Sequence, residues 1–266
     1  MDADSVRLVS FNVRRDRATD GEFDWAGRRE AVVSTLDFHR PDVVGLQEPL
    51  AHQYADVREG LSGYEWVGRS RKAGESDGEY CPVGYRADRF DRLDDGTLWL
   101  SETPAEPGSV GWDAARPRIL TWVRLRDREA DATFVVLNTH LDHEGERARR
   151  EGARLIRERV GGIRAGAPAV LSGDFNCTPG ERPHAILAGA DSPLADAREV
   201  TDRPWHGPDT TRTTFEDLNP DRAIDHAFVA GVGVGVSRLG VATDQFGDGW
   251  FPSDHLPLVV DLDPRW

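Results

Sequence analysis

The sequence predicts an α+β fold in which two β-sheets pack face to face and helices cover the outside. Apolar and polar residues alternate in many short segments, and Gly, Pro and Asp residues separate these segments as turn formers do. Only two stretches repeat apolar residues at the three- to four-residue spacing of a helix. Sheets with one apolar face bury that face most simply against each other, with helices outside.

The alternating segments are spread along the whole chain, and no linker or internal repeat separates them. Gly231–Gly235 reads as a turn followed by an edge strand. We therefore expect a single domain, residues 1–266. The predicted strands are Val6–Phe11, Asp42–Leu46, Val83–Arg86, Thr97–Leu100, Ile119–Leu125, Thr133–Asn138, Ala169–Leu171, Ala223–Val229 and Leu258–Val260.

Two helices are predicted between these strands. The first begins near Trp25 and must end before Pro41, because proline cannot continue a helix. The second lies near Glu144–Ile163 and has an apolar stripe on one face, with Arg and Glu on the other.

The composition favours a soluble, globular, cytoplasmic protein. Hydrophobic residues make up 38% of the chain, enough for a large core, which excludes a disordered protein. No apolar run approaches the roughly 18 residues of a membrane span, and the start at Met1 lacks the pattern of a signal peptide. The two cysteines, Cys81 and Cys177, do not suggest a disulfide framework.

The charge is unusual in kind as well as in amount. The chain has 47 acidic and 33 basic residues, a formal net charge of −14, and Lys72 is its only lysine. An acidic excess almost without lysine is typical of proteins from salt-loving cytoplasms, where surface carboxylates keep a protein soluble. A GC-rich genome that encodes Arg for Lys also explains the missing lysines, though not the surplus acids.

Polar residues follow or precede six of the apolar runs, in order along the chain. Singly, such residues are typical of turns and caps. Together, at strand ends of a rigid sandwich, they predict a functional site at one rim. They are Asn12, Gln47-Glu48, Asn138-Thr139-His140, Gly173-Asp174-Phe175-Asn176, Asp225 and Ser253-Asp254-His255.

These ordered motifs resemble the endonuclease/exonuclease/phosphatase superfamily, the deoxyribonuclease I-like phosphoesterases, over nearly the whole chain. Gly96–Pro104 and Trp112–Ala115 also resemble an uncharacterised bacterial and archaeal branch, and with the charge they suggest a halophilic archaeon. The resemblance implies a four-layer α/β/β/α sandwich with two mainly antiparallel sheets. It also implies a Mg²⁺- or Mn²⁺-dependent phosphoric ester hydrolase acting on a phosphorylated small molecule or nucleic acid. No membrane span and no obligate protein partner are expected.

The resemblance assigns the metal ligands. Glu48, helped by Asn12, would hold the divalent cation, and Asp254 would be a second carboxylate on the metal side. These oxygen donors suit a hard cation, and Mg²⁺ needs few protein ligands because it keeps several waters.

The same resemblance assigns the groups around the phosphate. Asp174 would orient or deprotonate the attacking water, and Asn176 would donate to the phosphate. His255, backed by Asp225, would bind the phosphate or stabilise the pentacovalent state. His140 would contact the phosphate from the opposite side.

Three assignments keep alternatives, and one motif departs from the pattern of the family. Glu79 is either the carboxylate partner of His140 or a solvated loop end. Arg118 is either a substrate-binding residue or a solvated strand end. The run Asp142–Glu144 fits a helix start better than a separate metal site. Many relatives have Arg-Ile-Asp-Tyr where this chain has Ala223–His226, which keeps the aspartate but changes its neighbours.

The expected reaction is hydrolysis of a phosphodiester or phosphomonoester by direct attack of water. A true nuclease is the alternative, and a non-catalytic phosphate-binding module a remote one. The negative charge argues against nucleic acid, but molar salt would remove long-range steering. The loops Arg14–Arg17 and Arg69–Lys72 either bind phosphate or are solvated. Four aromatic residues either stack on bases or cap the core: Trp112, Trp205, Trp250 and Phe251.

Overall fold

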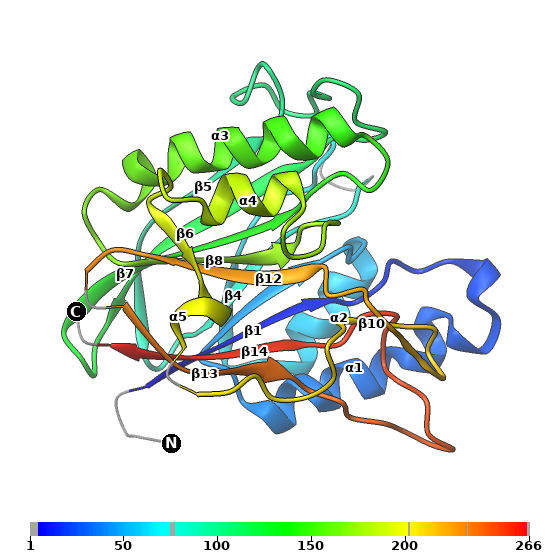
Figure 1. Ribbon diagram of the computed structural model, residues 1–266. Helices are drawn as coiled ribbons and strands as arrows, with labels where there is room; N and C mark the ends of the chain where they lie inside the picture. Colours follow the sequence, from blue (N-terminus) through cyan, green and yellow to red (C-terminus); the bar gives the residue numbers. More distant parts are fainter. Residues whose placement is uncertain (1–4, 75–77, 202, 233, 265–266) are drawn as a thin grey trace.

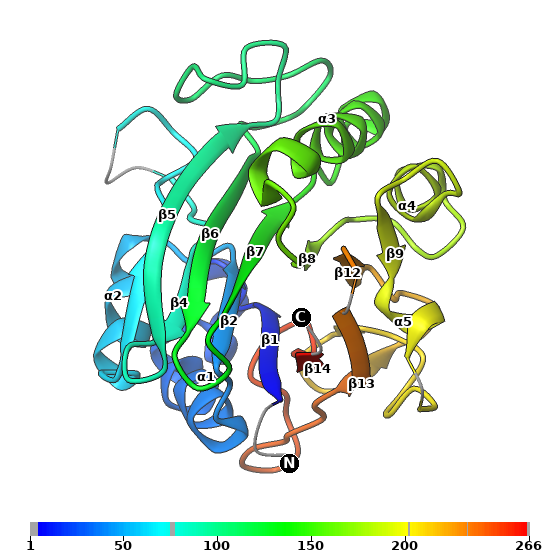
Figure 2. The same ribbon diagram turned by 90° about the vertical axis from the view of Figure 1, so that its left-hand side faces the viewer.

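The computed structural model describes residues 5–74, 78–201, 203–232 and 234–264. Two sheets pack face to face, with α3 (Glu146–Arg164) and α4 (Arg182–Ala188) outside one and α1 (Trp25–His39) and α2 (Ala51–Gly60) outside the other (Figures 1 and 2). The predicted four-layer α+β sandwich is therefore confirmed.

The first sheet, called here the β1 sheet, has six strands in the order β13-β14-β1-β2-β4-β3. The β1–β2 pair is parallel and the other pairs are antiparallel. Its strands are β1 (Val6–Asn12), β2 (Val43–Gln47), β3 (Tyr64–Val67), β4 (Val83–Arg86), β13 (Val234–Val241) and β14 (Leu258–Pro264).

The second sheet, called the β7 sheet, has the order β5-β6-β7-β8-β12-β9. Only its β7–β8 pair is parallel. Its strands are β5 (Phe90–Trp99), β6 (Ile119–Asp127), β7 (Ala132–His140), β8 (Ala169–Asp174), β9 (Leu194–Asp196) and β12 (Asp225–Ala230). The short elements β10 (Arg212–Thr213), β11 (Leu218–Asn219), α5 (Ala197–Val200) and the 3-10 turn Ala18–Phe23 lie outside both sheets.

The central strands are buried at almost every position because both faces of each sheet are covered. In β1, Leu8 belongs to the core between the sheets, whereas its neighbour Val9 packs in the cluster that contains Leu36 of α1. On the other side, Leu137 of β7 packs in one cluster with Ile156 of α3. Each helix layer thus buries the outer face of its own sheet.

A polar link crosses the interface between the sheets. Gln47 of β2 donates from Nε2 to Asn138 Oδ1 of β7 over 2.7 Å, and Asn138 Nδ2 donates to the carbonyls of Leu46 and Pro82. Both side chains are fully buried. Because buried amides are costly unless bonded, this link fixes one relative position of the two sheets.

Most of the predicted boundaries are close to those observed. The first helix starts at Trp25, with Asp24 as its N-cap, and ends at His39. Asp142 accepts from the backbone of Glu144 and Gly145 just before α3, as expected of a helix start. The predicted strand Thr97–Leu100 is the end of the longer β5, whose first half is largely exposed.

Several elements were missed. The helices α2 and α4 and the strands β3 and β9 are short, and α2 is mostly polar, so no clear periodicity marks them. The predicted edge strand after Gly231 is β13, which begins at Val234; residue 233 lies outside the described residues.

Candidate active site

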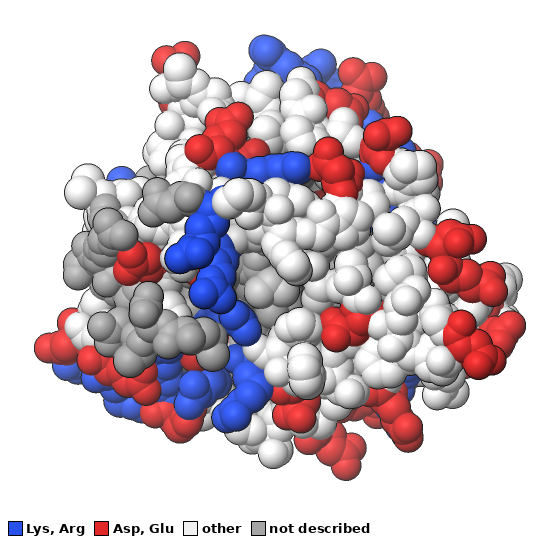
Figure 3. All heavy atoms as spheres, turned by 60° about the horizontal axis from the view of Figure 1, so that its bottom comes forward, with Lys and Arg blue, Asp and Glu red and all other residues white. Residues whose placement is uncertain are grey.

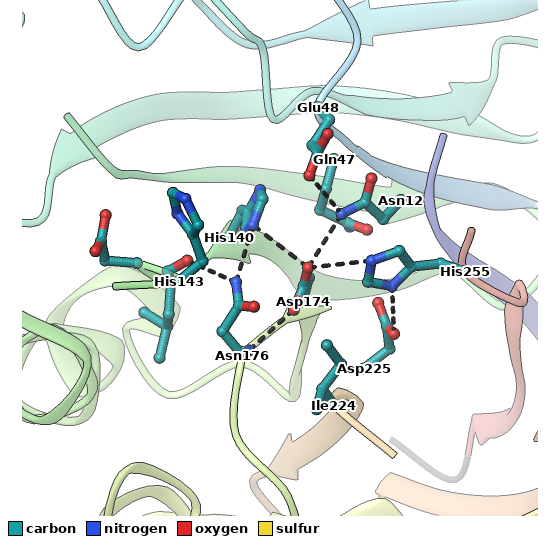
Figure 4. Close-up of polar contacts among 12 residues, drawn as sticks. Asn12, Gln47, Glu48, His140, His143, Asp174, Asn176, Ile224, Asp225 and His255 are labelled. Carbon is teal, nitrogen blue, oxygen red and sulfur yellow. Dashed lines mark hydrogen bonds and ion pairs between the residues drawn. The ribbon is translucent and has the colours of Figure 1, made fainter. Parts of the chain in front are cut away.

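Most of the polar residues singled out in the sequence meet at one end of the sandwich, between the two sheets (Figure 4). The parallel pairs β1–β2 and β7–β8 explain this, because parallel strands bring their carboxyl ends to the same edge. Asn12 and Glu48 come from the β1 sheet, and His140 and Asp174 from the β7 sheet.

Asp174 is the centre of the cluster. Its Oδ2 accepts from Asn12 Nδ2 at 3.0 Å and lies 3.3 Å from His140 Nε2 and 3.6 Å from His255 Nε2. Its Oδ1 accepts from the backbone N–H of Asn176 at 2.9 Å. Burial raises the pKa of Asp174 to about 6, although the positive charge of His255 opposes this shift.

His255 forms a buried pair with Asp225. The distance from His255 Nδ1 to Asp225 Oδ2 is 2.8 Å, so Nδ1 carries the proton and Nε2 faces Asp174 and the cavity. Burial alone would lower the pKa of His255, but the carboxylates of Asp225 and Asp174 outweigh it and raise the pKa to about 9. Asp225 is itself positioned by Thr211, whose Oγ1 accepts from its backbone N–H.

Arg212 of β10 lies beside this pair. Its Nη1 contacts both His255 Nε2 and Asp254 Oδ2. Because a guanidinium only donates, it bonds to Nε2 only while the imidazole is neutral. When His255 is protonated, its imidazolium and the Arg212 guanidinium both direct N–H groups into the space between them, and this favours binding of an anion there.

His140 is held in a neutral state on the other side of Asp174. Burial, together with the charge of Arg118, holds the pKa of His140 well below its usual range. Asn176 Nδ2 lies 3.1 Å from His140 Nε2 and also donates to the carbonyl of Leu141 at 3.0 Å. Nε2 is therefore an acceptor, with the ring proton on Nδ1.

Glu79 lines the same cavity but is not hydrogen-bonded to His140 among the described residues. Its two carboxylate oxygens contact Arg71, at 2.8 and 2.7 Å, and one of them also contacts Arg15 at 3.1 Å. Two permanently charged guanidiniums are stronger partners than a neutral imidazole. The structure thus brings Glu79 to the cavity, but with arginines in place of the expected histidine.

The groups expected to hold a metal offer oxygen atoms. Glu48 accepts from Asn12 Nδ2 at 3.2 Å and from the backbone N–H of Arg15 at 3.0 Å. Burial alone would raise the pKa of Glu48, but this N–H and the positive charge of His255 outweigh burial and hold the pKa well below its usual range. An ionised, half-buried carboxylate beside an amide side chain suits a hard divalent cation.

Asp254 has one oxygen in use and one free. Oδ2 contacts Arg14 and Arg212, whereas Oδ1 is buried and has no hydrogen-bond partner among the described residues. Ligand atoms of a further group, Asp174, Asp225 and His255, lie within 4.8 Å of one another and could also hold a metal ion. The donor chemistry at this end of the sandwich therefore fits a divalent cation.

A cavity of about 380 Å³ opens over these groups. Eight arginines line it, although the protein as a whole is acidic. Apart from histidines, no aromatic residue in the described part of the chain lines it. The arginines are Arg14, Arg15, Arg17, Arg71, Arg116, Arg118, Arg212 and Arg222.

The structure decides several open alternatives. Arg118 is not a solvated strand end: it is buried and contacts Asp142 and His143. Phe251 belongs to the core between the sheets, and Trp205 packs against that core. Sequence reasoning gave no role to Arg212, which lies outside the arginine-rich runs and the strand-end motifs. It also gave none to Arg222, although Arg222 directly precedes the Ala223–His226 motif.

Known proteins are similar to this chain in sequence and in fold. The sequence model of the endonuclease/exonuclease/phosphatase family matches residues 9–255. A protein of that description from Bacteroides vulgatus is 35% identical, with a TM-score of 0.91, over 98% of this chain and 99% of its own. A mannosyl-6-phosphatase from Bacteroides thetaiotaomicron is 33% identical, with a TM-score of 0.92, over 97% of this chain and 99% of its own. An uncharacterised protein of Acanthamoeba polyphaga mimivirus is 23% identical over 96% of this chain and 99% of its own.

Proposed function

The chain belongs to the endonuclease/exonuclease/phosphatase family, and from this membership we propose that it is a divalent-metal-dependent phosphoesterase that cleaves its substrate by direct attack of water. The observation that carries the proposal is the position of Asp174, between two histidines and two asparagines at the base of an arginine-lined cavity.

Glu48 and Asn12, with Asp254 nearby, are the proposed ligands of the cation. We propose Mg²⁺ or Mn²⁺, because the donors are hard oxygen atoms. When bound, the cation would neutralise charge on the phosphoryl oxygens. Because these residues would hold the cation beside Asp174, a phosphoryl group bound to the cation would also lie near Asp174.

Asp174 is the proposed general base. With a pKa of about 6 it is largely ionised at neutral pH yet remains basic enough to take a proton from water. Asn12 Nδ2 and the backbone N–H of Asn176 hold its two oxygens, so the carboxylate cannot rotate away. This positioning lowers the entropic cost of aligning the water.

His255 and Arg212 are proposed to bind the charge that develops on the phosphoryl group. Asp225 keeps His255 protonated, and Arg212 lies against the same Nε2. An oxyanion placed between them would relieve the repulsion between the two cations. On the opposite side, Asn176 Nδ2 would exchange its contact with His140 for one with a phosphoryl oxygen.

A phosphorylated small molecule is the proposed substrate class. The cavity is small, and no base-stacking aromatic lines its described wall. The mannosyl-6-phosphatase of Bacteroides thetaiotaomicron, 33% identical, makes a sugar phosphate the first compound to test. A nuclease remains the alternative, because arginines bind the phosphates of nucleic acid equally well.

A substrate panel tests the proposal. Sugar phosphates, nucleotides, and single- and double-stranded DNA and RNA are incubated with Mg²⁺ or Mn²⁺, and released phosphate or shortened strands are measured. We expect phosphate release from small phosphoesters, loss of that release in EDTA and recovery when the cation is restored. Full activity in EDTA would exclude the metal-dependent reaction, and cleavage of nucleic acid alone would establish the nuclease.

A further inference from the structure

One side of the cavity carries positive charge that the proposed reaction does not use. Arg71, Arg116 and Arg118 line it. Arg118 contacts His143, and burial together with the charges of Arg118 and Arg116 lowers the pKa of both Arg71 and His143, so the three arginines lie together near His143. In Figure 4, His143 and His255 lie on opposite sides of Asp174, so this side is turned away from the His255–Asp225 pair. The scissile phosphate, held near Asp174 and His255, would leave these three arginines free for another group.

Two of these guanidiniums are buried and incompletely bonded. Arg71 is 6% exposed and Arg118 is 5% exposed. Arg71 Nε and Arg118 Nη1 are buried donors without a hydrogen-bond partner in the described structure. A buried N–H that lacks a partner is costly, and such groups usually serve a ligand or water.

Their remaining contacts hold the two side chains in place. Both terminal nitrogens of Arg71 bond Glu79, and Arg118 bonds Asp142 and His143. The Arg71 carbonyl accepts from Trp99 Nε1 at 2.6 Å. The arginines are therefore pre-ordered, which lowers the entropic cost of binding an anion.

Arg116 adds an uncompensated charge at the edge of this group. It is exposed, lines the same cavity and has no ion-pair partner among the described residues. Arg116 and Arg118 are two residues apart in the chain, and both line the cavity.

The local charges do not cancel. Arg15 shares Glu79 with Arg71, so four guanidiniums on this side pair with two carboxylates, those of Glu79 and Asp142. Glu48 also lines the cavity and attracts Arg71 more weakly, so the guanidiniums still outnumber the carboxylates and positive charge remains for an anion. Burial, with the charges of Arg118 and Arg116, lowers the pKa of Arg71 to about 10, as expected where cations lie close together.

We propose that Arg71, Arg116 and Arg118 form a second anion site, and that the substrate is a small molecule with two phosphoryl groups, one cleaved at Asp174 and one held here. The inference rests on the proposed phosphoesterase function, because it describes the far end of the same substrate. Guanidinium groups bind phosphate through paired, charge-assisted hydrogen bonds, so this site selects for the second phosphate.

Binding without turnover tests the second site. Glucose 6-phosphate, glucose 1,6-bisphosphate and a 5′-phosphorylated dinucleotide are titrated calorimetrically into the protein in EDTA, where no hydrolysis is expected. We expect the bisphosphate to bind at least about tenfold more tightly than the monophosphate, because hydrogen bonds between charged groups typically add that much affinity. The Arg116→Gln variant should lose most of that ratio, and because Arg116 is exposed the substitution should not affect folding.

Arg222→Gln is the matched control, since Arg222 is also exposed, lines the same cavity and has no ion-pair partner among the described residues. In this variant the ratio of the two affinities should stay as in the wild type. Equal affinities for the two sugars, or an equal loss of the ratio in both variants, would overturn the second site. A dinucleotide that binds more tightly than both sugars would overturn the small-molecule assignment. Hydrolysis in Mg²⁺ is measured separately, so failure of the phosphoesterase proposal would be seen independently.

Discussion

At the scale of single residues, Asp174 is the group on which the proposed chemistry depends most. Replacing it by Asn keeps its size and most of its contacts but removes the charge and the basic oxygen. We expect Asp174→Asn to lower kcat by at least about 10²-fold, the usual contribution of a general base. The measurement is steady-state hydrolysis of an activated phosphoester.

The control for this variant is Asp191→Asn, because Asp191 is exposed, lies between α4 and β9 and does not line the cavity. It should retain wild-type activity, and both variants should show the circular dichroism of the folded protein. If Asp174→Asn hydrolyses the substrate at the wild-type rate, Asp174 is not the base.

The pH profile reports on the same cluster. The proposed mechanism requires ionised Asp174, with a pKa of about 6, and protonated His255, with a pKa of about 9. The kcat/KM of the free enzyme should therefore rise with pH through the first value and fall through the second, giving a bell.

Asp225→Asn separates the two sides of this bell. Removing the Asp225 carboxylate lowers the pKa of His255, because that carboxylate raises it. The alkaline limb should then move to lower pH and the maximal rate should fall. The amide that replaces the carboxylate has nearly the same size, so it still fits the space. An alkaline limb that stays where it is in the wild type would assign it to a different group.

The sequence was sufficient to find the residues of the cluster but not all of their partners. Asn12, Glu48, Asp174 and His255 stand at strand ends, and strand ends are visible as the limits of apolar runs. Arg212 contacts His255 across 43 residues of chain from a two-residue strand. No local pattern in the sequence encodes such a contact.

At the scale of elements, α1 positions two loops of the site through a single side chain. Arg28 is fully buried and donates to the carbonyls of Phe23, Val13, Arg14 and Pro252. These carbonyls belong to the segment after β1 and to the segment that precedes Asp254. Burial lowers the pKa of Arg28 to about 10, and no carboxylate bonds to it among the described residues.

Arg28→Met should therefore destabilise the protein strongly. The substitution leaves several buried carbonyls without a donor, and losses of this kind cost about 3 to 5 kcal/mol. Urea unfolding measures the change, and Arg29→Met, at an exposed position of the same helix, is the control. A free energy of unfolding equal to that of the wild type would show that the guanidinium is not required.

Elements with one strong pattern were easier to predict than elements stabilised by tertiary contacts. The apolar stripe of α3 is clear in the sequence. The helix α2 has only three buried residues, and its role depends on packing against α1 and the β1 sheet. Gln47 and Asn138 were singled out for a site, but the structure shows that they also join the two sheets.

At the scale of the whole molecule, the charges are divided between the cavity and the surface. The net charge is −14, yet arginines dominate the cavity. On the face shown in Figure 3, acidic groups lie mainly around the margin and basic side chains form a band. Among the described residues, no helix has the length and apolar character needed to cross a bilayer.

The acidic excess predicts a response of stability to salt. Like charges repel one another in the folded state, and added ions screen this repulsion. We therefore expect the melting temperature to rise between low and molar KCl. Differential scanning calorimetry in EDTA measures this without a contribution from bound divalent cations. A melting temperature that is unchanged or lower in molar KCl would contradict the expectation of a salt-adapted surface.

The proposed active site is divided between the two sheets, so its activity should depend on the intact fold. Asn12 and Glu48 stand on one sheet and Asp174 on the other, and Asn12 Nδ2 lies within hydrogen-bond distance of both carboxylates. Neither sheet alone holds a working set of groups. A fragment of this protein should have no residual activity, and heat inactivation should coincide with global unfolding. Remote substitutions that alter the spacing of the sheets should slow the reaction without touching a catalytic side chain.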